Sequence, residues 1–147
     1  MRAPSVSARR TEPIEEQAIR ELVELWFAGL DSRRSEVLVG MTNPEIVIRP
    51  FLARQPVDAV SYVGHDGVRD WVASLDSDMR ISLNLIAIEV TADQSAVVEA
   101  EVFFERQGTR TGEMTWSLWR FDSGKLSEAI GYGSRDEALD AERGSWH

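Results

Sequence analysis

The chain has 147 residues, of which 43% are apolar and 28% charged, and this fits one globular domain with a real core. The net charge of −9 gives a surface that repels phosphate backbones, so it argues against a nucleic-acid partner. The absence of cysteine excludes disulfides, and two histidines are too few for a histidine-rich metal site, so we expect neither a metal nor another cofactor.

The N-terminal segment carries no recognisable targeting signal. MRAPSVSARRTEP contains arginine and serine but no apolar run, so we expect a disordered arm over residues 1–12 and no secretory signal. No apolar stretch approaches the roughly 18 residues that span a bilayer, so we expect a cytoplasmic protein with no membrane partner. A single domain is predicted over residues 13–142, followed by a flexible tail over residues 143–147.

The N-terminal third shows helical periodicity. Residues 14–31 repeat apolar side chains at helical spacing, with acidic residues in the first turn, and predict the first helix. Ser32 can cap a short second helix that stops before Asn43 and Pro44. The segment EIVIRPF then reads as a strand that ends or bulges at Pro50.

A long loop is predicted over residues 52–64, and Asp66 can cap a third helix after it. The hydrophobic period then changes from 3.6 to 2, which predicts four strands. In the first of them the alternation slips between Leu85 and Ile86, which indicates a β-bulge. Helices first and strands later predict an α+β fold, with three helices packed on one face of a mainly antiparallel sheet.

The last predicted strand, over residues 125–133, has one bulky face and one nearly bare face. The small residues Ser127, Ala129, Gly131 and Gly133 alternate with Leu126, Glu128, Ile130 and Tyr132. If the bare face turns inward, it leaves room for a small molecule, and the apolar outer face then needs cover. In the opposite assignment, the large residues fill the core and the small ones face water.

Three local patterns resemble the SnoaL-like group of the nuclear transport factor 2-like superfamily. They are VIRP on the first strand, YVGHDGVRDWVASL on the third helix, and the terminal hairpin with Trp119, Gly124, Lys125 and Tyr132. The resemblance covers residues 14–141. It implies a cone-shaped barrel, whose strongly curved sheet wraps a deep cavity that the helices close. It also implies a homodimer through the convex sheet face, and it favours the inward orientation of the bare strand face.

The superfamily includes ketosteroid isomerases, polyketide cyclases, epoxide hydrolases and non-catalytic binding modules, so the chemistry has to be argued from the site. Aligned on the resemblance, the Asp–Arg–Asp relay of the epoxide hydrolases falls on Glu99, Glu101 and Gly131. A glutamate therefore stands where an arginine is expected, and the last carboxylate is missing. The relay is broken, which argues against that reaction.

Glu99 and Glu101 nevertheless remain the candidate catalytic acids. Two acids at i and i+2 lie on one face of a strand, and carboxylates close together in an apolar cavity raise at least one pKa, which suits acid–base catalysis. In the alternative, Val98 and its i+2 neighbours face inward and both glutamates are solvated. Arg49 either binds a ligand oxygen or a glutamate, or lies at the strand edge with its charge in water.

Aromatic and titratable side chains supply the candidate ligand-binding residues. His65 is a candidate base or donor, or else it packs beside a helix cap. Tyr62 is a candidate oxyanion donor, as a tyrosine is in the isomerases that the chain resembles. Four further aromatic residues either line a pocket for a planar ligand or form ordinary core. They are Trp26, Trp71, Phe103 and Trp119.

These observations predict a protein that binds a small hydrophobic or aromatic molecule. A cofactor-free isomerisation, cyclisation or hydration would use Glu99 or Glu101 as acid or base and Arg49 as the oxyanion partner. The alternative is a non-catalytic ligand-binding or protein-interaction module with the same cavity, in which the polar residues are merely structural.

Overall fold

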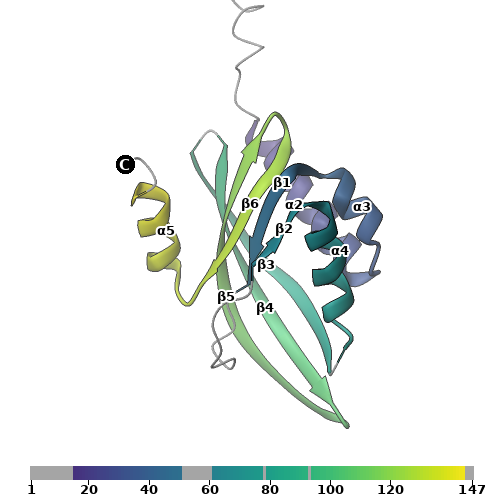
Figure 1. The fold of residues 1–147 in the computed structure, drawn as a ribbon. Helices are drawn as coiled ribbons and strands as arrows, with labels where there is room; N and C mark the ends of the chain where they lie inside the picture. The colour runs from purple at the N-terminus through teal and green to yellow at the C-terminus, as the bar shows by residue number, and fades with distance from the viewer. Residues whose placement is uncertain (1–14, 51–60, 78, 93, 145–147) are drawn as a thin grey trace, which may run out of the picture.

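The computed structural model describes residues 15–50, 61–77, 79–92 and 94–144. The predicted arm at the N-terminus, most of the predicted 52–64 loop and the end of the predicted tail lie outside these residues. Figure 1 shows the described chain as a curved sheet with three helices on one side and one helix on the other.

The described elements come in the predicted order, helices mostly first and strands later. The helices are α2 (Glu16–Asp31), α3 (Ser35–Gly40), α4 (Gly64–Ser74) and α5 (Arg135–Gly144). The strands are β1 (Thr42–Arg49), β2 (Tyr62–Val63), β3 (Arg80–Ala92), β4 (Ser95–Arg106), β5 (Thr109–Asp122) and β6 (Lys125–Tyr132). None of the helices in the described part of the chain is long and apolar enough to cross a membrane.

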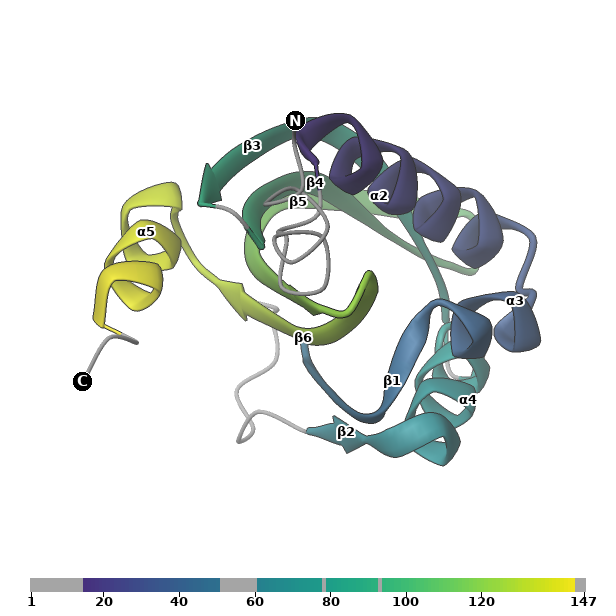
Figure 2. The ribbon, with the colours of Figure 1, turned by 90° about the horizontal axis from the view of Figure 1, so that it is seen from above.

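The strands form one mixed sheet in the order β2-β1-β6-β5-β4-β3. Only the β1–β6 pair is parallel; the other four neighbouring pairs are antiparallel. Seen from above, the sheet is strongly curved, with α2, α3 and α4 on its concave side and α5 outside the curve (Figure 2). The predicted α+β class and the curved sheet are confirmed. The sheet stays open, because β2 and β3 are its free edges.

Both predicted helix caps are wrong. Ser32 ends α2 instead of starting α3, because its hydroxyl donates to the Ala28 carbonyl oxygen at 2.9 Å. α4 begins at Gly64, ahead of Asp66, because Gly64 has a φ of +76° that lets the chain turn directly from β2 into the helix. β1 also starts earlier than predicted and includes Pro44, in a stretch where its pairing with β6 is irregular.

The predicted bulge in β3 is confirmed. The pairing of β3 with β4 shifts between Leu85 and Ala87, and this leaves Ile86 as the extra residue. Ile86 is 47% exposed, whereas Leu85 and Ile88 both pack against the core. The bulge therefore lets both halves of the strand turn their apolar side chains to the concave side.

Two arginines near α2 reach the edge strand β3. Arg20 Nη1 donates to the Ile88 carbonyl oxygen at 3.0 Å, and Arg33 Nη2 donates to the Ile81 carbonyl oxygen at 2.6 Å. Arg33 Nε also donates to the carboxylate of Asp76 at 2.8 Å, and this hydrogen bond lowers the pKa of Asp76. Arg33 thus ties the end of α2 to the connection between α4 and β3.

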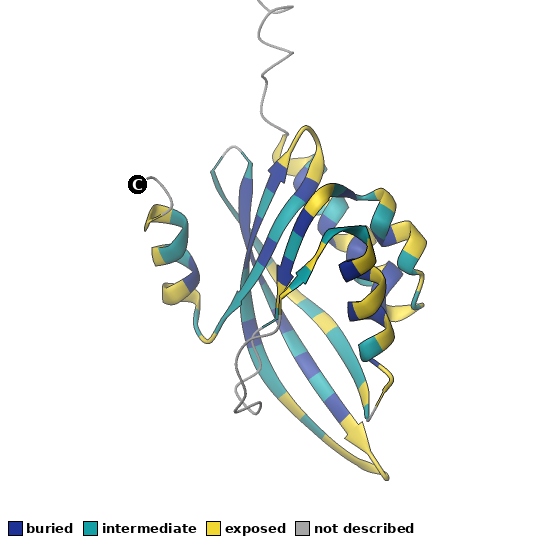
Figure 3. Ribbon diagram, in the orientation of Figure 1, coloured by how far each residue is buried: buried dark blue, intermediate teal, exposed yellow. Residues whose placement is uncertain are grey.

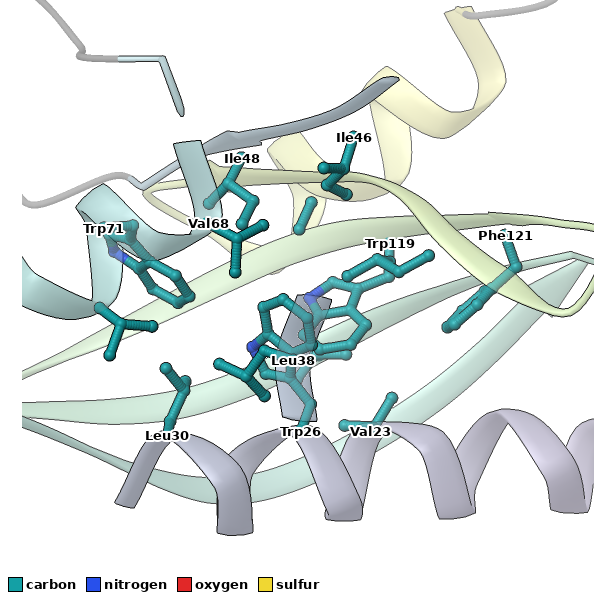
Figure 4. Packing of buried hydrophobic residues seen from close by; sticks show 14 of the residues in the cluster. Val23, Trp26, Leu30, Leu38, Ile46, Ile48, Val68, Trp71, Trp119 and Phe121 are labelled. Atoms are coloured by element: carbon teal, nitrogen blue, oxygen red, sulfur yellow. The ribbon is translucent and has the colours of Figure 1, made fainter. Parts of the chain in front are cut away.

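The main core lies between the concave sheet face and the helices. Trp26 of α2, Trp71 of α4 and Trp119 of β5 belong to it, and Trp26 and Trp119 meet near its centre (Figure 4). A smaller cluster on the convex face joins Val97 and Leu118 to α5. Figure 3 shows the buried positions along the middle of the strands, whereas the tip of the β4–β5 hairpin is exposed.

Candidate functional site

A cavity of about 270 Å³ lies between the concave sheet face and the helices α2 and α4. All six strands contribute to its wall, and so does the connection between α4 and β3. Ligand pockets for drug-sized molecules start at about 300 Å³, so this cavity suits a compound of one or two rings.

Aromatic side chains form one end of the cavity. The rings of Trp26 and Trp71 stack with their centroids 6.1 Å apart and an interplanar angle of 22°. Trp119 meets Trp26 edge to face at 5.7 Å and stacks on Phe27 at 6.3 Å. Trp26 is 2% exposed and Trp119 3%, so these residues are core and cavity wall at once. Their place in the core is therefore established, and their contact with a ligand stays a prediction.

The bare face of β6 turns inward, as predicted, at Ala129 and Gly131, which line the cavity. The prediction is wrong for Leu126, which is 2% exposed in the main core. The reason is a second bulge: the pairing of β5 with β6 shifts and leaves Ser127 as the extra residue. One inserted residue reverses the alternation, because side chains repeat every two residues along a strand.

Tyr62 lines the cavity from β2, beside Ile48 of β1. Its position depends on Gly67 in α4. A Cβ atom at residue 67 would lie 2.7 Å from the Tyr62 carbonyl carbon, so only glycine lets α4 pack this closely against β2. The predicted ligand-binding position of Tyr62 is thus compatible with the structure.

Thr115 and Ser117 of β5 place hydroxyl groups in the cavity wall. Ser117 Oγ accepts a hydrogen bond from Trp119 Nε1 at 2.9 Å. Ser117 Oγ in turn lies 3.5 Å from the Val98 carbonyl oxygen. The sequence analysis did not single out these hydroxyls. The signal available was the alternation in TWSLW, which puts Thr115, Ser117 and Trp119 on one face.

Arg49 belongs to the cavity rim rather than to its interior. It contributes to the wall, but along β1 its side chain alternates with Ile48, which is buried in the core. Its Nε donates to Ser61 Oγ at 3.0 Å, and the residue is exposed. Its positive charge also acts on the phenol of Tyr132, whose pKa is raised mainly by burial. The structure therefore agrees with the alternative of an arginine at the strand edge.

Glu99 and Glu101 do not face the cavity. Ala100 and Val102 of the same strand line it, and residues one position apart point to opposite faces. Phe103 shares the outer face with the glutamates, and the Arg110 guanidinium carbon lies 3.9 Å from its ring centroid. The predicted inward placement is therefore wrong for Glu99, Glu101 and Phe103. The apolar residues that alternate with them, such as Ala100 and Val102, occupy the inward-facing positions of the strand.

His65 lies in the first turn of α4, and its Nε2 is 3.3 Å from the Thr42 carbonyl oxygen at the start of β1. It is not part of the cavity wall. This contact joins the helix to the sheet, so the alternative of a packed histidine near the helix start is the one that the structure supports.

Glu113 was missed by the sequence analysis. It pairs with Val102 across the β4–β5 ladder and shares the inward phase of Thr115, so it faces the concave side. Its Oε1 atom is buried. By contrast, the wall of the cavity contains no Asp, Glu or His among the described residues, and no group of acidic or histidine residues in the described ranges could hold a metal ion.

No family model and no curated protein matches the sequence. Solved structures match over most of the chain. The epoxide hydrolase/cyclase-like enzyme SalBIII, with a role in pyran ring formation in polyether salinomycin, has a TM-score of 0.67 and 15% identity, over 83% of this chain and 95% of its own. TerC, co-crystallized with polyporic acid, has a TM-score of 0.67 and 15% identity, over 84% and 98%.

A third match is Rv0760c from Mycobacterium tuberculosis, in complex with estradiol-17beta-hemisuccinate. Its TM-score is 0.66 and its identity 11%, over 81% of this chain and 95% of its own. At these identities the likeness establishes the fold. The chain has the cone-shaped, nuclear transport factor 2-like fold that polyketide cyclases and ketosteroid isomerase-like proteins share, as the sequence resemblance predicted.

Proposed function

We propose that this is a cytoplasmic protein that binds a small hydrophobic or aromatic molecule in the cavity of about 270 Å³. The observation that carries the proposal is the composition of the wall, which contains three tryptophans together with the small residues Ala129 and Gly131. Indole rings offer flat apolar contact to a ligand ring, and small residues leave space for it. Rv0760c in complex with estradiol-17beta-hemisuccinate and TerC co-crystallized with polyporic acid support a small-molecule ligand for a cavity of this fold.

Tryptophan fluorescence tests the proposal directly, because three of the five tryptophans line the cavity. A panel of uncharged compounds with one to four rings is titrated into a Trp116→Phe variant. Trp116 packs beside α5 on the convex face, so its removal lowers background signal without touching the cavity. We expect saturable quenching or a blue shift with one- and two-ring compounds. No saturable change with any compound, up to its solubility, would reject the proposal.

Catalysis is a second candidate, and the buried Oε1 atom of the half-buried Glu113 on the concave side favours it. A cofactor-free isomerase, cyclase or hydratase needs an acid or base near the ligand. We assign that role to Glu113 in place of Glu99 and Glu101, with Arg49 available to a ligand oxygen at the rim. The assay is deuterium exchange of the methyl protons of 2-acetylnaphthalene in D₂O, followed by NMR. If the protein is an enzyme, we expect deuterium exchange faster than in buffer alone, and loss of this acceleration in Glu113→Gln. Exchange at the rate of buffer alone would contradict catalysis and favour a binding module.

We also propose a homodimer through the convex sheet face. Ile130 and Met114 lie there half-buried, outside the cluster that α5 forms with the sheet. α5 covers part of this face, over Val97 and Leu118. The proposed dimer interface is therefore the remaining part of the face, nearer β1 and on the outer part of β5. Sedimentation velocity tests this, and a monomer at high protein concentration would contradict it.

A further inference from the structure

We infer that Ser117 is a built-in hydrogen-bond donor of the cavity, and that it selects an uncharged ring compound carrying a carbonyl oxygen. The inference rests on the proposed binding function and specifies its ligand. It comes from the hydrogen bonds of one hydroxyl and from the side chains that surround it.

One of the two acceptor lone pairs of the Ser117 hydroxyl is already in use. Trp119 Nε1 donates to Ser117 Oγ at 2.9 Å, a normal length for such a bond. The indole N–H can only donate, so it needs an acceptor, and Ser117 Oγ provides one. Donation into the oxygen also polarises the hydroxyl, and a hydroxyl that accepts one bond donates the next more strongly.

The donor side is poorly satisfied. Among the described residues, the Ser117 hydroxyl points to the Val98 carbonyl oxygen, at a distance of 3.5 Å. Bonds between a hydroxyl and an oxygen usually measure about 2.5 to 3.0 Å, so this contact is weak. A hydroxyl proton in a largely apolar wall gains by turning to a better acceptor. A bound ligand is the natural source of one.

A ligand can reach the hydroxyl because its neighbour across the ladder is Gly131. Both residues line the cavity. Glycine contributes no side chain beside Ser117, so a flat ring can lie over the β6 backbone with one oxygen against Oγ. The rest of the ring then extends toward the aromatic end at Trp119.

The chemistry of the wall narrows the class of ligand. Arg49 is the one charged residue in the described part of the wall, and it lies at the rim, where its Nε donates to Ser61 Oγ. A charged ligand would therefore lose its hydration without a counter-ion in the interior. A ligand hydroxyl would bring a proton that needs its own acceptor, whereas a carbonyl oxygen only accepts. Aryl ketones and related ring carbonyl compounds fit this requirement.

A matched pair of probes tests the inference. 2-Acetylnaphthalene and 2-ethylnaphthalene have nearly the same shape, but only the first has a carbonyl oxygen. Their dissociation constants are measured by equilibrium dialysis for the wild type and for Ser117→Ala. We expect the variant to bind the ketone roughly three- to tenfold more weakly, which is the usual worth of one neutral hydrogen bond, and to bind the hydrocarbon unchanged.

Ser74→Ala is the matched control. Ser74 also lines the cavity, but its hydroxyl donates to the Trp71 carbonyl oxygen at 2.6 Å and is fully engaged. We expect it to leave the difference between the two probes as in the wild type. If Ser117→Ala does not fold, Ser117→Cys replaces it, because a thiol of similar size is a weak donor.

Infrared spectroscopy of the ¹³C-labelled ketone measures the carbonyl stretching frequency, which would not change if Ser117 only stabilised the fold. We expect the bound carbonyl stretch to lie at lower frequency in the wild type than in Ser117→Ala. Equal weakening of both probes, or an unchanged carbonyl frequency, would overturn the inference while leaving the binding function intact. Absence of ketone binding to the wild type would also overturn the inference, whereas the binding function is rejected only if no compound of the fluorescence panel binds.

Discussion

Replacing Gly131 by leucine should separate stability from binding, because the free energy of unfolding should change little whereas ligand binding should be lost. Gly131 lies in the interior of β6, where glycine costs about 0.5–1 kcal/mol relative to a residue with a side chain. A leucine side chain placed in the cavity would gain a further 1.5–3 kcal/mol, roughly, by leaving water. Overpacking subtracts about 1–3 kcal/mol. The free energy of unfolding should therefore change by between about −1 and +3 kcal/mol.

Binding should be lost in the same variant. The leucine side chain would occupy a cavity of only about 270 Å³ and would cover Ser117, its partner across the ladder. We expect Gly131→Leu to bind the ring compounds of the fluorescence panel at least about 100-fold more weakly, a loss equivalent to about 2.7 kcal/mol.

Urea denaturation and fluorescence titration measure the two effects on one preparation. Ile130→Leu is the matched control, because it places the same side chain on the outer face of the same strand, and it should change neither quantity. Destabilisation by several kcal/mol together with retained binding would refute the reasoning, since it would mean that residue 131 meets packed atoms rather than open space.

Three further predictions concern other parts of the molecule. Trp26→Ala should lower the free energy of unfolding by about 3–5 kcal/mol, measured by urea denaturation, because this side chain is almost fully buried in the main core. Because the pKa of Asp76 is lowered in the folded protein, its pair with Arg33 stabilises the fold above the pKa that Asp76 has in the unfolded chain, and this contribution is lost as the pH falls through the folded-state pKa. Asp76→Asn should therefore be less stable than the wild type at pH 7 and should lose less stability between pH 5 and pH 2. Circular dichroism measures both effects. Ile130→Glu should shift a dimer toward monomer in sedimentation experiments, whereas an unchanged dimer would place the interface elsewhere.

Periodicity was sufficient to predict most of the fold, including the bulge in β3. A slip between Leu85 and Ile86 is visible because two apolar sets of opposite phase adjoin there. The bulge at Ser127 leaves no such trace, because Leu126 and Ile130 look alike in the sequence although only Leu126 faces the core. The short strand β2 was also missed, since two residues are too few to show a period.

The candidate site could be predicted only where residue type and phase agree. Trp26, Trp71, Trp119, Tyr62 and Gly131 reach the cavity wall, because bulky apolar and very small residues both indicate the inner face. The acidic residues of β4 were misplaced, since charge gives chemical interest but the alternation of small apolar residues decides which face is buried. For Ser117 the alternation in TWSLW indicates the face of the strand, but the hydrogen-bond partners of its hydroxyl are visible only in the coordinates.

The contacts that Arg20 and Arg33 make with β3 have a consequence beyond the single molecule. An edge strand presents peptide groups that can recruit a strand from a neighbouring chain, and long edges of this kind promote aggregation. Here two guanidinium groups already occupy carbonyl oxygens at Ile81 and Ile88, the second and ninth of the strand's thirteen residues. Growth of the sheet into fibres along this side is thereby opposed, and substituting both arginines with alanine should make concentrated solutions of the protein prone to precipitate.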